Sequence, residues 1–121
     1  MIKKLFSVVL IAGTLSVNAQ YTKLVDFALT TNGAEPLGSL IQASDGMLYG
    51  MTGYGGANTY GVIFQYNPAT NTLIDKYDFN NANGGNPQGS LMQATDGMLY
   101  GTTSNGGANF DGVIFQYNPV T

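Results

Sequence analysis

Residues 38–70 read GSLIQASDGMLYGMTGYGGANTYGVIFQYNPAT, and residues 89–121 read GSLMQATDGMLYGTTSNGGANFDGVIFQYNPVT. The two copies are identical at 25 of 33 positions and lie 51 residues apart. A period of this length is typical of arrays of supersecondary units, which bury their apolar faces against one another. We therefore predict a repeat protein, with repeat 1 at residues 38–88 and an incomplete repeat 2 at residues 89–121.

Each full repeat is predicted to contain four short strands. In repeat 1 they are expected at residues 39–43, 47–52, 62–66 and 72–79. Structural turns are expected at Asp45, Gly46, Asp96 and Gly97, because Asp-Gly is a strong hairpin signal. Four antiparallel strands in about 50 residues form one propeller-blade unit. A β-solenoid or another meander is the alternative, but the Asp-Gly hairpins favour antiparallel pairing.

A further strand is predicted ahead of the repeats, in the segment of residues 20–37 that forms an N-terminal strand and connector. Residues 21–27 alternate between apolar and polar side chains and end in Asp-Phe, as residues 73–79 do. We expect an all-β fold of β-propeller-like blades with four antiparallel strands, with about two blades present as a fragment of a longer array. The third strand of repeat 2, at residues 113–117, should then have an open edge, which residues 21–27 are positioned to cover.

The first 19 residues have the pattern of a signal peptide. Lys3 and Lys4 precede an uncharged, mostly apolar run at residues 5–17, and Ala19 supplies a small residue before Gln20. A membrane anchor is the alternative, but the run is shorter than the roughly 18–20 residues that span a bilayer. The expected location is therefore secreted or cell-surface.

Composition excludes several classes of function. The net charge is −3 and the chain has no Arg, so it lacks the clustered basic residues of a nucleic-acid-binding surface. It also has no Cys, His or Trp. Thiol nucleophiles, histidine bases and His/Cys metal sites are therefore excluded, and no cofactor is expected.

The repeated motifs resemble a known tandem repeat, the GloVer repeat. Its pattern runs roughly D-G-x-L-Y-G-T-T, G-G-x-N and G-x-[VI]-F, which residues 96–103, 106–109 and 112–115 match in full. The first copy departs from it at Met51, where the family usually has Thr. The resemblance implies a secreted multi-repeat protein with a propeller-like, kelch-style fold, and it implies no established activity.

No catalytic residue and no metal site are predicted. Asp45 and Asp96 are repeat-equivalent acids, but each precedes Gly in a turn, where Asp is expected for its geometry. Equivalent residues should also have similar pKa values, unlike a working acid–base pair. Asp75 and Asp78 offer oxygen ligands for calcium without the order of a calcium-binding loop.

The candidate binding site is the glycine-rich loop that varies between the copies. Four of the eight mismatches fall in residues 53–61 and their counterparts at 104–112. Variable loops on a rigid scaffold commonly carry recognition. Exposed aromatic side chains there suit sugar stacking, although packing between blades is the commoner use. Asn58 and Asn109 are expected to adopt left-handed backbone or to bond back to the chain. The candidate binding residues are Tyr54, Asn58, Tyr60, Asn105, Asn109 and Phe110.

These observations favour a secreted, non-enzymatic binding or scaffold module. Its expected partners are an extracellular protein or carbohydrate and further repeats of the same chain, with no nucleic acid and no membrane after signal cleavage. The alternative is the N-terminal part of a secreted polysaccharide-directed enzyme whose catalytic residues lie outside this chain. A purely structural stalk, a third reading, should have uniform loops.

Overall fold

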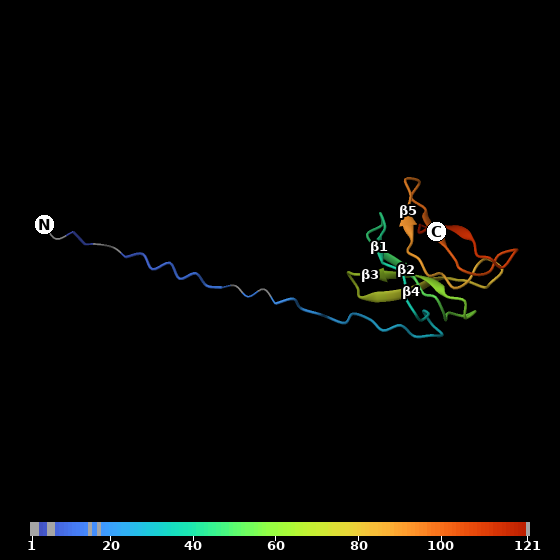
Figure 1. The fold of residues 1–121 in the computed structure, drawn as a ribbon, viewed down its shortest axis with the longest axis horizontal. Helices are drawn as coiled ribbons and strands as arrows, with labels where there is room; N and C mark the ends of the chain where they lie inside the picture. Colours follow the sequence, from blue (N-terminus) through green and yellow to red (C-terminus); the bar gives the residue numbers. More distant parts are fainter. Residues whose placement is uncertain (1–2, 5–6, 15, 17, 121) are drawn as a thin grey trace.

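The computed structural model describes residues 3–4, 7–14, 16 and 18–120, and these contain seven β-strands and no helix. The strands form two antiparallel sheets, one per repeat, of four and three strands (Figure 1). The predicted all-β fold with four-stranded antiparallel units is thereby confirmed.

The first sheet is a meander in the order β1-β2-β3-β4. Its strands are β1 (Ile41–Gln42), β2 (Leu48–Met51), β3 (Val62–Asn67) and β4 (Thr72–Asp78). The Asp45-Gly46 turn connects β1 to β2, and a turn ending at Asn71, whose φ is 54°, connects β3 to β4. Asn accepts this left-handed conformation more readily than most residues.

The second sheet repeats the first three strands of this meander. It contains β5 (Met92–Gln93), β6 (Leu99–Thr102) and β7 (Ile114–Tyr117), in the order β5-β6-β7. Register is kept as well, since Tyr49↔Gln65 in the first sheet corresponds to Tyr100↔Gln116 in the second. Within the described part of the chain, no strand pairs with the outer edge of β7, as expected for an open edge.

The strand predicted at residues 21–27 is not formed, and these residues do not cover β7. They lie instead over the face of the first sheet that carries Leu40, Leu48 and Phe64, so they meet the face of a sheet and not the edge of a strand. The sequence likeness to residues 73–79 nevertheless has a structural counterpart. The Phe27 ring packs edge-on against Phe64 at 5.0 Å, as the Phe79 ring packs against Phe115 at 5.2 Å.

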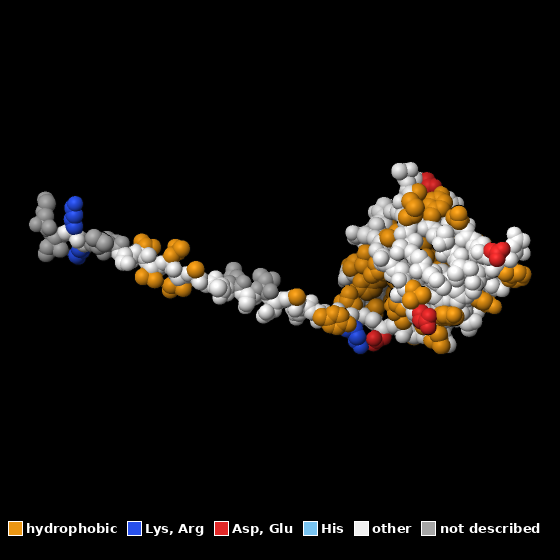
Figure 2. All heavy atoms as spheres, viewed as in Figure 1, with side chains coloured by type: hydrophobic (Ala, Val, Ile, Leu, Met, Phe, Trp, Pro, Cys, Tyr) orange, Lys and Arg blue, Asp and Glu red, His pale blue; other side chains and the backbone are white. Residues whose placement is uncertain are grey.

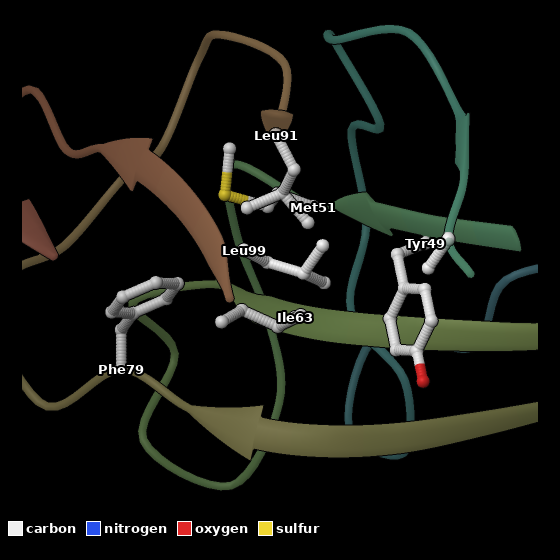
Figure 3. Close-up of a cluster of buried hydrophobic side chains, with 7 residues drawn as sticks. Tyr49, Met51, Ile63, Phe79, Leu91 and Leu99 are labelled. Carbon is white, nitrogen blue, oxygen red and sulfur yellow. The ribbon is translucent and has the colours of Figure 1, made fainter. Parts of the chain in front are cut away.

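The hydrophobic core lies between the two sheets (Figure 3). Tyr49, Met51 and Ile63 point from the first sheet toward Leu99 of the second sheet and Leu91, which immediately precedes it. The sheets therefore stabilise each other through one shared core, as the repeat period predicts.

The two repeats approach so closely at their first residues, Gly38 and Gly89, that a side chain would not fit between them. A Cβ atom on Gly38 would lie 2.1 Å from the Gly89 carbonyl oxygen. Beside this contact, the Ser39 N–H donates to Ser90 Oγ at 2.8 Å. The Ser44 N–H similarly donates to Gln93 Oε1 at 2.8 Å. Hydrogen bonds between side chains and backbone thus join the repeats at one end of the core.

The N-terminal segment extends away from the sheets (Figure 1). The apolar side chains of residues 8–11 are exposed. Residues 1–2, 5–6, 15 and 17 of the predicted signal peptide lie outside the described residues, as does residue 121 of repeat 2. No helix in the described ranges is long and apolar enough to cross a membrane.

Candidate functional site

The two variable loops, which we call loop A (residues 53–61) and loop B (residues 104–112), share one backbone frame. Each has two consecutive glycines with φ between 78° and 81°. The Gly61 N–H donates to the Gly55 carbonyl at 3.0 Å, and Gly112 to Gly106 at the same distance. The frame is therefore built from residues common to both copies.

A buried threonine hydroxyl holds the base of each loop. Thr52 Oγ1 accepts the Val62 N–H at 3.1 Å and donates to the Tyr54 carbonyl at 3.0 Å. Thr103 Oγ1 makes the same two bonds in repeat 2, at 3.1 and 2.9 Å. Val in place of Thr would leave the Val62 or Val113 N–H without its acceptor, whereas the carbonyls of the loop each keep a backbone N–H as a second donor.

The left-handed residue in each loop is not the predicted asparagine. Thr59 and Phe110, each one position further on, have φ of 66° and 61°. Asn58 and Asn109 are exposed, and neither has a positive φ. The N–H of Thr59 donates to the Gly56 carbonyl at 3.4 Å, and the N–H of Phe110 donates to the Gly107 carbonyl at 3.2 Å. This hydrogen bond and the two preceding glycines determine which residue takes the left-handed conformation.

The predicted binding residues are not all available to a ligand. Phe110 is 70% exposed and Tyr54 is 51% exposed. Asn105 is also exposed, but its side-chain amide donates to Asn86 Oδ1 at 3.1 Å. Tyr60 is half-buried and packs against the core between the sheets. Tyr60 therefore has the packing role that was the alternative for these aromatic residues.

Asn86 connects the two loops and was not identified from the sequence. Its side-chain amide donates to the Gly53 carbonyl at 2.9 Å, and its own carbonyl accepts the Ser104 hydroxyl at 2.7 Å. Its φ is 51°, and its repeat-equivalent Glu35 has φ of 58°. The available signal was its position before Pro87, which matches Glu35-Pro36, but a residue before proline is ordinarily extended.

The turn acids are engaged in local structure. Asp45 Oδ1 accepts the Met47 N–H at 2.9 Å, while Oδ2 accepts the Tyr49 hydroxyl at 2.7 Å. Burial, and then the bond to Asp45, raises the pKa of Tyr49 to about 12. Asp96 makes the same two bonds, to Met98 and Tyr100. Each carboxylate therefore stabilises its turn and accepts a hydrogen bond from a tyrosine hydroxyl.

Asp75, in the middle of β4, and Asp78, at its end, lie close enough to interact. Burial, and then the neighbouring charge of Asp78, raises the pKa of Asp75 to about 6. Asp78 Oδ1 also accepts the Ala57 N–H at 2.5 Å and so ties loop A to β4. No group of three or more His, Cys, Asp or Glu side chains occurs in the described residues. The pair anchors a loop and offers fewer acidic ligands than a calcium site uses.

A family model described as the Gloeobacter/Verrucomicrobia repeat matches residues 11–121. No curated protein and no solved structure matches the chain.

Proposed function

The chain belongs to the Gloeobacter/Verrucomicrobia repeat family, and on that premise we propose that it is an exported module that binds an extracellular carbohydrate without catalysing a reaction. Loops A and B form the binding surface, and the two sheets hold them in place. The N-terminal signal-peptide pattern supports export.

One observation carries the proposal: Phe110 is held in a left-handed conformation and is largely exposed. A bulky side chain with φ of 61° is strained by about 1 kcal/mol or more. The ring is 70% exposed, so its faces are accessible to a ligand. Because the same loop frame gives Thr59 a φ of 66°, loop B differs from loop A in placing an aromatic ring at this position.

The surrounding chemistry favours a sugar ligand. Aromatic faces pack on the apolar faces of sugar rings, while amides bond to their hydroxyl groups. Phe110 follows the exposed Asn109 in loop B, and loop A exposes Tyr54 and Asn58. Asp111 is the one charged residue in the sequences of the two loops. A surface with so little charge suits a neutral ligand.

Phe110→Asn is the most informative variant. Asn accepts positive φ, so the substitution relieves the backbone while it removes the ring. Pull-down on insoluble cellulose, chitin and xylan, with affinity electrophoresis in soluble polysaccharides, should find at least one that the wild-type chain binds. On that polysaccharide, Phe110→Asn should weaken binding about tenfold or more, which corresponds to about 1.4 kcal/mol.

Thr59→Asn is the matched control, since it makes the same backbone change in loop A without removing an aromatic ring. It should leave binding within about twofold of wild type, a difference below about 0.5 kcal/mol. Retention of full affinity in Phe110→Asn, or failure of the wild-type chain to bind any of the polysaccharides, would contradict the proposal.

A further inference from the structure

Two apolar surfaces, one on each sheet, are left open although their repeat-equivalents are buried. Ile63 is 1% exposed, while its equivalent Ile114 is 81% exposed. On the opposite face of the repeats, Leu91 is 3% exposed and its equivalent Leu40 is 53% exposed. Because the local sequences are nearly the same, the difference arises from what covers each residue.

The first open surface is the outer face of the second sheet, which we call the outer face. It contains Met92, Tyr100 and Ile114, which share one side of the sheet by register. Their equivalents in repeat 1 point into the core between the sheets.

The second open surface is a groove of about 420 Å³ on the first sheet. Hydrophobic side chains gather where the N-terminal segment meets the sheets (Figure 2). The groove is lined by the N-terminal segment on one side and by Leu40, Leu48, Phe64 and Leu73 on the other. Leu91 and Leu99, which are equivalent to Leu40 and Leu48, are covered within the chain by the first sheet.

We propose that the outer face of one molecule packs into the groove of a second copy of this chain, head to tail, repeating the contact that joins the two repeats. The contact between the two repeats is the model for this packing. Within one molecule, the surface of repeat 1 that is equivalent to the outer face already packs on the surface of repeat 2 that is equivalent to the groove. The side chains that form hydrogen bonds between the two repeats have counterparts at the contact between two molecules. Ser90 and Ser39 exchange roles across the new contact, and Thr95 takes the place of Ser44 opposite Gln42.

If the contact between the two molecules repeats the contact between the two repeats, residues 21–26 of the second copy lie at the open edge of β7. In the first sheet, β4 pairs with β3 and continues into Phe79, which packs on the next repeat. Residues 21–26 precede Phe27 in the same way. They would add a fourth strand to the second sheet, and Asp26 would take the place of Asp78 at the Ala108 N–H of loop B.

This register predicts one specific pair. Gln65 lies opposite Ile74 in the first sheet. The equivalent pair is Gln116 of one molecule and Thr22 of the second copy. Directly opposed residues in antiparallel strands have Cα atoms about 4.5–5.5 Å apart, which a disulfide can bridge.

Mixing single-cysteine variants tests the arrangement, because the chain has no native Cys. Thr22→Cys and Gln116→Cys, made in the full chain and mixed under mild oxidation, should form a mixed disulfide dimer in preference to either self-pair. Asn109→Cys, in exposed loop B, is the control partner for Thr22→Cys and should not cross-link preferentially. Gln116→Cys dimers alone would mean that β7 edges pair with each other, which would overturn the proposal.

The mass in solution gives a second measurement. Light scattering should detect concentration-dependent association of the 12.8 kDa chain. Ile114→Lys should shift the midpoint of that association at least tenfold toward higher concentration, because it puts a charge on the outer face. Leu29→Lys, at a residue 58% exposed outside both surfaces, should not shift it. A monomer up to high micromolar concentration, or association insensitive to Ile114→Lys, would refute head-to-tail packing.

Discussion

Truncating the same residue in the two repeats should have very different costs. Ile63 and Ile114 occupy equivalent positions in β3 and β7, yet only Ile63 is buried between the sheets. Ile→Ala removes three carbon groups, each worth about 0.8 kcal/mol when fully buried. Ile63→Ala should therefore lower the free energy of unfolding by about 2.5 kcal/mol from transfer alone, and by about 3–4 kcal/mol with the cavity it leaves.

Ile114→Ala is the matched control within the same molecule. With about a fifth of the side chain covered, its loss should be about 0.5 kcal/mol. Urea unfolding followed by tyrosine fluorescence and far-UV circular dichroism measures both, at a protein concentration where the chain is monomeric. Equal losses for the two variants would show that the sheets do not share the core described above.

Three further outcomes are expected. Gly97→Val should lower the free energy of unfolding by about 1–3 kcal/mol through backbone strain, because φ is 83° and nothing lies within 4 Å of the added Cβ. Gly97→Asn should lower it much less. Equal melting temperatures for both variants and wild type would contradict this. The raised pKa of Asp75 means that the folded chain keeps a proton that the unfolded chain releases, so stability should fall as the pH rises from about 4 to about 6. Asp75→Asn should abolish that fall and raise the melting temperature at pH 7 but not at pH 3, and an unchanged pH profile would refute it. The protein recovered after export should begin at Gln20 by N-terminal sequencing, and a retained apolar run would show that no signal peptide is cleaved there.

Local sequence was sufficient to predict the strands that have partners and the turns between them. Asp-Gly specifies a hairpin because Gly accepts the positive φ that the turn requires, and Gly46 and Gly97 both have it. Alternating apolar residues then locate the strands on either side. The repeat period likewise indicated that the two units share a core.

Other features depended on contacts distant in sequence. Residues 21–27 have the alternation of a strand, but a strand forms only beside an edge that bonds to it, and the first sheet presents its face there. The left-handed residue in each loop follows from two glycines and a hydrogen bond across the turn, so the neighbouring asparagine was a poor guide. Asn86 connects the loops through groups 33 and 18 residues away, which no local pattern encodes.

The repeated sequence therefore determined the strands, the turns and the pairing of each unit, because these depend on backbone conformation and on alternation within a few residues. Burial was decided by tertiary structure alone. Ile63 and Ile114 stand in the same six-residue context, GVIFQY, and differ from almost fully buried to almost fully exposed. A residue's own sequence specifies which face of the sheet it occupies, whereas its exposure depends on whether another sheet packs on that face.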